Sequence, residues 1–367
     1  MIPERFKLVR EIRGFTQIEL VRRIESLNGR HVAQSTVAEI ETGRLVPSSD
    51  LAEAIGQATG FPLEFFELGD LREFPSGSLV FFRAKSVVTA KEEAQVRRHA
   101  QLAAEIVDVL SRRIDLLQCR IPQLTECAPT EAAQLTRSAL GLSPDSPIDN
   151  LIRTIERAGV LLLALPISRD PVDAFSVWTG QRDQVPCIAL LSDAPADRQR
   201  FSVAHELGHL VLHRSMRGST ALLEDEASRF ASELLTPRAA MELEIVRPVT
   251  LFGLRDLKAR WRVSMRMLIN RAHEVGGITA RQRSYLFMKM NATFGGRAEP
   301  TLFLKERPRA LHQMFEMVYG IPIDYETAAF DLHLAPQMIE TMLQQYQGGA
   351  SRTNDAPENV FDFHPGT

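Results

Sequence analysis

Two histidines four residues apart, with a glutamate directly after the first, are the residues best suited to chemistry. The segment 201–213 contains His205, Glu206 and His209 in the order H-E-x-x-H. On a helix, residues i and i+4 lie on one face, so both imidazoles can reach one Zn²⁺ ion. Glu206 leaves such a helix about 100° away from His205, which favours a role as general base over a role as ligand. The motif therefore predicts a hydrolytic zinc site.

A catalytic zinc ion needs a third protein ligand and an open position. A metzincin would carry glycine and histidine where this sequence has Leu212 and Ser215, so that class is excluded. His213 lies about 6 Å further along the helix axis than His209, so it cannot bind the same ion without a break in the helix. We expect His213 to support the ligands from behind or to pack in the core.

The third ligand is therefore expected among the acidic residues of the segment 224–235. The acids at its start could instead simply complement the dipole of a helix N-terminus. We choose Glu226, because the small residue Ala227 follows it and permits a close approach of two helices. Glu224 is expected to lie behind the ligands or at the surface, and it is the next candidate.

The residues around the motif extend the pattern over much of the chain. They comprise Phe82-Arg83-Ala84, Ala174-Phe175-Ser176, Asp197-Arg198-Gln199-Arg200-Phe201, Glu226-Ala227, Phe230-Ala231, Pro237, Leu257-Lys258, Arg260-Trp261 and Val263-Ser264. This pattern resembles the ImmA/IrrE family of zinc metallopeptidases. The resemblance implies that His205 and His209 bind Zn²⁺ and that Glu226 is the third ligand. It also implies that Glu206 is the catalytic acid/base of an endopeptidase.

A second pattern lies in residues 1–70. It comprises Arg10, Gly14, Thr16-Gln17, Leu20, Gln34-Ser35-Thr36-Val37, Ile40-Glu41 and Gly43. This pattern resembles the XRE-type helix-turn-helix, in which the second helix of the motif enters the major groove of DNA. The resemblance implies that Gln34, Ser35 and Glu39 face base edges, with Thr36 beside them. It implies that Gln17 holds a phosphate, and that Arg10 and Glu41 pair inside the module.

Two features of residues 1–70 depart from that family. About six extra residues around Ser26–His31 lengthen the turn between the helices, which is usually short. The segment holds 8 Lys/Arg and 11 Asp/Glu, an acidic balance that is unusual for DNA binding. The alternative is a helical module that binds protein or only dimerises. Residues 254–275 also have a helix-turn-helix-like pattern, and residues 251–290 hold 9 Lys/Arg and 2 Asp/Glu. That basic segment predicts a second nucleic-acid contact, a docking face for substrate or simply a solvated helix.

The elements that must position these residues are mostly helices. Short apolar runs predict strands at 160–165, 174–178 and 187–191. Helices are expected at 195–214, which carries the histidines, and at 223–235, which carries the acids. The predicted fold is α+β and mostly helical. It has a helix-turn-helix domain (1–70), a helical connector (71–125) and a zincin-like peptidase domain with a small sheet (126–245). A helical C-terminal region (246–345) and a disordered tail (346–367) follow.

The composition indicates a globular protein of several domains: 367 residues, 44% hydrophobic and 24% charged. The chain contains neither a run of about 18 apolar residues nor a secretory signal, so we expect no membrane partner. Three irregularly spaced cysteines predict a reducing, cytoplasmic location. The expected partners are a protein substrate, such as a repressor, double-stranded DNA and a second copy of the chain. The alternative function is a DNA-binding regulator whose peptidase domain is a sensor or silent, and self-cleavage near residues 71–90 is a third hypothesis.

Overall fold

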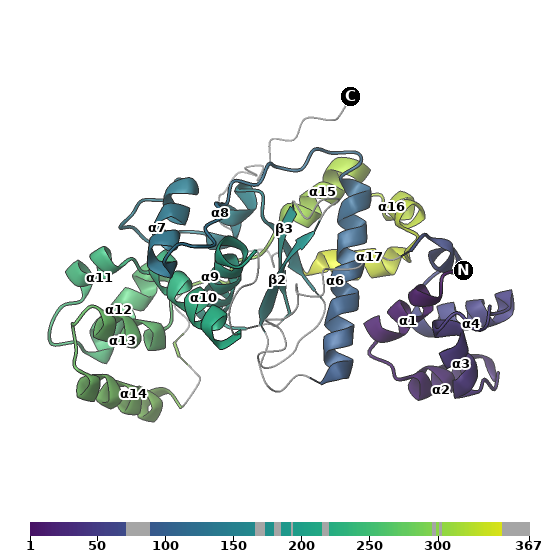
Figure 1. The fold of residues 1–367 in the computed structure, drawn as a ribbon, viewed down its shortest axis with the longest axis horizontal. Helices are drawn as coiled ribbons and strands as arrows, with labels where there is room; N and C mark the ends of the chain where they lie inside the picture. The colour runs from purple at the N-terminus through teal and green to yellow at the C-terminus, as the bar shows by residue number, and fades with distance from the viewer. Residues whose placement is uncertain are drawn as a thin grey trace.

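The computed structural model describes residues 1–70, 89–165, 173–179, 185–191, 194–214, 220–295, 299–300 and 303–346. Helices dominate these residues, and a three-stranded sheet lies in the middle of the molecule (Figure 1). The predicted fold class, α+β and mostly helical with a small central sheet, is confirmed. The predicted tail beyond Tyr346, most of the connector 71–90 and the Phe82-Arg83-Ala84 pattern lie outside the described residues.

The N-terminal helices form one end of the molecule (Figure 1). They are α1 (Pro3–Ile12), α2 (Gln17–Asn28), α3 (Gln34–Glu41) and α4 (Ser49–Thr59), followed by the 3-10 helix η1 (Leu63–Glu67). Helix α2 begins with a capping box, in which Thr16 and Glu19 satisfy each other's backbone N–H groups. The extra residues of the turn partly lengthen α2, which continues to Asn28 and ends at Gly29 with φ 65°. A glycine suits this left-handed cap because it has no Cβ.

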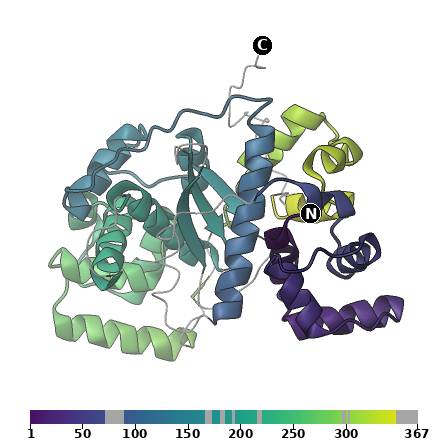
Figure 2. The same ribbon diagram turned by 45° about the vertical axis from the view of Figure 1, so that its right-hand side comes forward.

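Helix α6 (Ala90–Leu110) stands between the N-terminal helices and the sheet, as Figures 1 and 2 both show. The sequence predicted a helical connector that continues to residue 125. The helix instead ends at Leu110, while Ile114 remains buried in the same core without being helical. The last helices of the described chain return to this side: α15 (Ala310–Tyr319), α16 (Tyr325–Leu332) and α17 (Pro336–Gln344).

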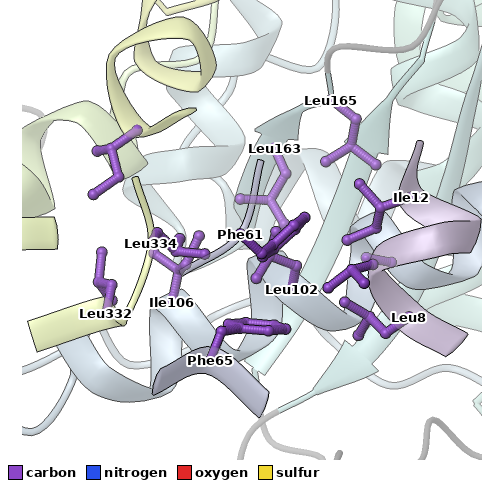
Figure 3. Close-up of a cluster of buried hydrophobic side chains, with 14 of the residues drawn as sticks. Leu8, Ile12, Phe61, Phe65, Leu102, Ile106, Leu163, Leu165, Leu332 and Leu334 are labelled. Carbon is purple, nitrogen blue, oxygen red and sulfur yellow. The ribbon is translucent and has the colours of Figure 1, made fainter. Parts of the chain in front are cut away.

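The sheet separates two hydrophobic cores. Its strands are β1 (Leu161–Ala164), β2 (Ala174–Thr179) and β3 (Val185–Leu190), in the order β1-β3-β2, with β1 parallel and β2 antiparallel to β3. Because side chains alternate along a strand, Leu161 and Leu163 enter one core and Leu162 the other. Figure 3 shows Leu163 and Leu165 of the first core among side chains from α1, α6 and the α16 region.

The second core lies on the opposite face of the sheet and contains the helices around the histidines. These are α7 (Pro129–Ala139), α8 (Leu151–Arg157), α9 (Ala196–Leu212), α10 (Thr220–Leu235), α11 (Arg238–Glu244), α12 (Leu251–Trp261), α13 (Met265–Glu274) and α14 (Ala280–Phe294). Helices α9 and α10 pack closely at Gly208, where an added Cβ would lie 3.0 Å from the Phe230 ring and 3.3 Å from Ala227 Cα. None of the helices in the described ranges combines the length and apolar character that crossing a membrane requires.

Candidate metal centre

Helix α9 places His205, Glu206 and His209 in the interior, facing the sheet and α10. All three side chains are buried. The two histidines lie one turn apart on one face, as predicted, and their Nε2 atoms are 3.1 Å apart. Two Nε2 atoms that carry no hydrogen can lie this close together when both direct their lone pairs at one cation. The pair therefore has the geometry that the H-E-x-x-H spacing predicted.

Glu224 of α10 completes a cluster of three metal-ligating groups. One of its carboxylate oxygens lies 3.3 Å from His205 Nε2, and the other lies 3.4 Å from His209 Nε2. The three groups each offer a ligand atom within 4.8 Å of the others. Two imidazole nitrogens and one carboxylate are the ligand set of one class of catalytic zinc site. His205, His209 and Glu224, here called the metal centre, therefore fit a divalent metal such as zinc.

The structure places Glu226, the predicted third ligand, outside this cluster. Its carboxylate lies 2.9 Å from His213 Nε2 instead of joining the pair of histidines. Glu224 and Glu226 leave α10 about 200° apart around the helix axis, so the two carboxylates start in different directions. Which of them meets the histidines depends on the rotation of α10. The contact of Phe230 and Ala227 with Gly208 helps to fix that rotation.

Ser176 of β2 forms a hydrogen bond with Glu206, the glutamate of the H-E-x-x-H motif. Its hydroxyl donates a hydrogen bond of 2.8 Å to Glu206 Oε2, and both side chains are buried. Ser176 lies on the face of the sheet that covers α9, between two apolar neighbours that point the other way. The sequence included Ser176 only as part of a family pattern. A polar residue at an inward-facing position of a strand was the signal that could have identified Ser176. That signal does not reveal that its partner is Glu206.

The second nitrogen of each histidine also has a neighbour. Ser228 Oγ lies 3.3 Å from His205 Nδ1, and His213 Nδ1 lies 2.9 Å from His209 Nδ1. His213, just past the end of α9, is thus in contact with a ligand, one of the two roles expected for it. Ser228 was not predicted, because a serine in the middle of a helix gives no sequence signal.

Charge and burial act in opposite directions on Glu224. Burial alone would raise the pKa of its carboxyl, but hydrogen bonds and positive charge from His205 and His209 lower that pKa well below its ordinary value. Burial lowers the pKa of His213, and the hydrogen bond to Glu226 only partly opposes this. The centre therefore favours an ionised Glu224 carboxylate, the protonation state that binds a metal cation.

A cavity of about 520 Å³ lies beside the centre, between α10 and the pair α13 and α14. Its lining includes Phe201 and Ser228, which both contact His205, together with Met267, His273 and Arg283. A space of this size next to a candidate reaction centre can receive part of a peptide.

Several cations of the basic segment 251–290 are engaged inside the molecule. Lys258 is buried and donates to Asp197 and, at 2.8 Å, to Glu299. Arg271 is buried and pairs with Glu233. The excess of positive charge counted from the sequence therefore overstates the charge that this segment offers to a partner.

Residues 155–273 match the family model Peptidase_M78, described as the IrrE N-terminal-like domain. We call this segment the IrrE-like domain. It contains the whole sheet, α9 and α10, and hence His205, Glu206, His209 and Glu224. The match supports the ImmA/IrrE relationship for this part of the chain and a metallopeptidase type of function. The comparison with curated proteins gives no match.

The N-terminal residues predicted to bind DNA lie outside the IrrE-like domain. Arg10 and Glu41 form the predicted ion pair, with Nε and Oε1 2.5 Å apart. Gln17 donates to Glu41, and Gln34 donates to Gln17 at 3.1 Å, so one chain of side chains links α1, α2 and α3. The exposed residues of α3 include Gln34, Ser35 and Glu39, while Thr36 and Gln17 are half-buried.

Proposed function

We propose that this protein is a zinc-dependent endopeptidase joined to a DNA-binding module, and that it cleaves a repressor or a similar regulatory protein. The observation that supports the enzyme most directly is the cluster of His205, His209 and Glu224 beside Glu206, inside the IrrE-like domain. When bound, a zinc ion would lower the pKa of a water molecule and polarise the scissile carbonyl.

Glu206 and Ser176 are the residues of this chain that handle the proton in the proposed reaction. Glu206, oriented by the Ser176 hydroxyl, takes a proton from the attacking water and delivers it to the leaving amine. Strand β2, on which Ser176 lies, is one of the two outer strands of the sheet as described, and we propose that an extended peptide adds to this edge beside Glu206. The cavity next to His205 provides space for a further part of that peptide.

We propose that residues 1–70 bind double-stranded DNA through α3, with Gln34, Ser35, Thr36 and Glu39 near the bases and Gln17 near a phosphate. The exposure of Gln34, Ser35 and Glu39 on one short helix supports this proposal, as does the chain from Gln34 to Glu41 that holds the helices in register. Two such modules in a dimer would contact two half-sites. All three cysteines are free, which agrees with a cytoplasmic location.

Peptidase activity is tested by labelling new protein N-termini in a native cell extract. Zinc-loaded wild type should generate specific new N-termini, and Glu206→Gln should reduce their rate of appearance about 10²- to 10⁴-fold, because the general base is lost. Elemental analysis should find about one zinc per chain in both proteins. Absence of new N-termini with a zinc-loaded wild type would count against the proposal.

The second candidate function is a DNA-binding regulator whose IrrE-like domain senses a signal or is silent. The exposed face of α3 and the ordered chain of side chains behind it favour this candidate. A gel shift with Glu206→Gln separates the two functions. Unchanged DNA binding together with lost cleavage indicates independent modules, whereas DNA binding without any cleavage by wild type indicates the regulator.

A further inference from the structure

A chain of two hydrogen bonds leads from His209 away from the metal centre. His209 Nδ1 and His213 Nδ1 are 2.9 Å apart, and His213 Nε2 is 2.9 Å from Glu226 Oε2. His213 is held in place by its own backbone, since its N–H donates to His209 O at 3.0 Å. Its ring is buried, while the Glu226 carboxylate is 31% exposed at the edge of the site. The two residues thus lie behind a ligand and reach from it toward solvent.

We propose that His213 and Glu226 are positioning residues that hold His209 in the one tautomer able to bind a metal. This inference rests on the proposed metal centre. Only one hydrogen can lie between two Nδ1 atoms. If the hydrogen is on His209, the Nε2 atom of that ring keeps its lone pair for a cation. If it is on His213, a neutral His209 must carry its hydrogen on Nε2 and cannot bind.

Glu226 decides between these two arrangements. An ionised carboxylate only accepts hydrogen bonds, so the contact with Glu226 places a hydrogen on His213 Nε2. A neutral His213 then has a lone pair on Nδ1 and accepts from His209 Nδ1–H. The negative charge at the end of the chain also increases the electron density that His209 offers to a cation. Glu226 therefore acts on the metal through two imidazole rings, although it is not a ligand.

His205, the other histidine of the centre, has a different kind of neighbour at its second nitrogen. The neighbour of His205 Nδ1 is the Ser228 hydroxyl, which can donate or accept and so selects no tautomer by itself. Of the two ligand histidines, His209 is the one whose tautomer the protein determines. Removing His213 or Glu226 should therefore weaken metal binding without removing a ligand.

The test is a double-mutant cycle on zinc affinity, measured by competition with a chromophoric chelator. Glu226→Ala and His213→Leu should each weaken zinc binding about 10- to 100-fold. The double variant should be no weaker than the weaker single variant, because both residues act through one chain. Asp225→Ala, which removes the exposed neighbouring acid, should bind zinc like wild type. Glu224→Ala should lose binding far more severely, since it removes a ligand.

His213→Asn gives a conservative comparison, because its amide oxygen lies near the position of Nδ1 and can accept from His209. It should retain more zinc affinity than His213→Leu. Equal loss in Glu226→Ala and Glu224→Ala, additive effects in the cycle, or unchanged affinity in Glu226→Ala would each overturn the inference. Far-UV circular dichroism identifies any variant that fails to fold. If the variants of buried His213 do not fold, the zinc affinity of Glu226→Ala alone tests the inference. A wild type that binds no zinc would instead refute the proposed function.

Discussion

The metal centre and the face of α3 present their functional side chains in opposite ways. In the centre, His205, Glu206 and His209 are buried, and each has a neighbour within about 3.3 Å that orients it. On α3, Gln34 and Ser35 are exposed, and Gln34 donates a hydrogen bond to Gln17. Burial and orientation suit chemistry, which needs fixed geometry and low polarity around the reacting groups. Exposure suits recognition, which needs side chains that reach a partner.

This difference implies that substitutions near the centre act through packing and orientation, whereas substitutions on α3 act through the partner alone. The first kind should change stability or rate strongly, even at residues that touch no ligand. The second kind should leave the folded protein unaltered. The following experiments test that division, beginning with the largest effect.

Gly208→Val should be the most damaging change. A Cβ at this position would lie 3.0 Å from the Phe230 ring and 3.3 Å from Ala227 Cα, so α9 and α10 must move apart. We expect the free energy of unfolding to fall by about 3 kcal/mol, measured by urea denaturation. The matched control is Gly253→Val, in an exposed turn of α12 where the nearest atom is 3.6 Å away. Equal stability losses in the two variants would show that helix packing at Gly208 is not special.

Ser176→Ala should slow cleavage while leaving the metal in place. The change removes the 2.8 Å hydrogen bond to the buried Glu206 carboxylate. A hydrogen bond to a charged group contributes about 1.5–3 kcal/mol, which predicts a fall in kcat/KM of roughly 10- to 100-fold. The measurement uses a substrate identified from its new N-terminus, with zinc content determined in parallel. The control is Ser202→Ala: Ser202 lies on α9, as Glu206 does, but its hydroxyl contacts Asp173. This variant should cleave at the wild-type rate.

Gln34→Ala should weaken sequence discrimination on DNA and nothing else. Loss of one bidentate contact to a base costs about 1–3 kcal/mol, so the preference for a specific site should fall several-fold to a hundredfold. Binding to specific and scrambled duplexes can be compared by fluorescence anisotropy at fixed salt. Gln337→Ala, in the exposed part of α17, serves as the control. Unaltered discrimination in Gln34→Ala would argue that residues 1–70 bind protein instead.

The smallest effect concerns the contact between the N-terminal helices and α6. His99 Nε2 lies 3.2 Å from Ile12 O, and burial lowers the pKa of His99 to about 4. The unfolded chain, with an ordinary histidine pKa of about 6.5, binds more protons between these values, so stability falls as pH decreases from 6.5 toward 4. We expect a loss of about 1 kcal/mol between pH 7 and pH 5.5. His99→Gln should lack this contribution in paired urea titrations.

Local spacing was enough to predict the histidine pair and the three strands. Each depends on residues within a few positions of one another, where helix and strand periodicity decide the outcome. The third ligand could not be predicted in this way. Glu224 and Glu226 lie only two residues apart, and choosing between them requires the rotation of α10 against α9. That rotation is a tertiary property, fixed by contacts such as Phe230 with Gly208.

Ser176 and Ser228 illustrate a second limit. Both are ordinary residues whose roles arise only when the sheet and α10 are laid against α9. Similarly, the sequence predicted a helical C-terminal region over residues 246–345, but not which part of the molecule its last helices pack against. Tyr346 shows the consequence: its hydroxyl accepts a hydrogen bond of 2.8 Å from the Ala164 N–H, 182 positions earlier in the chain.

The division of the interior by the sheet has a consequence for synthesis on the ribosome. The core around α9 is assembled from one continuous stretch, from Ile121 to Met290. The core on the other face combines three separate stretches, and the last of them ends at Tyr346. A chain emerging from its N-terminus can therefore assemble the hydrophobic core around α9 first. The side that joins the N-terminal helices to the sheet closes only when translation is nearly over, so the core that carries the metal centre forms before the two sides are joined.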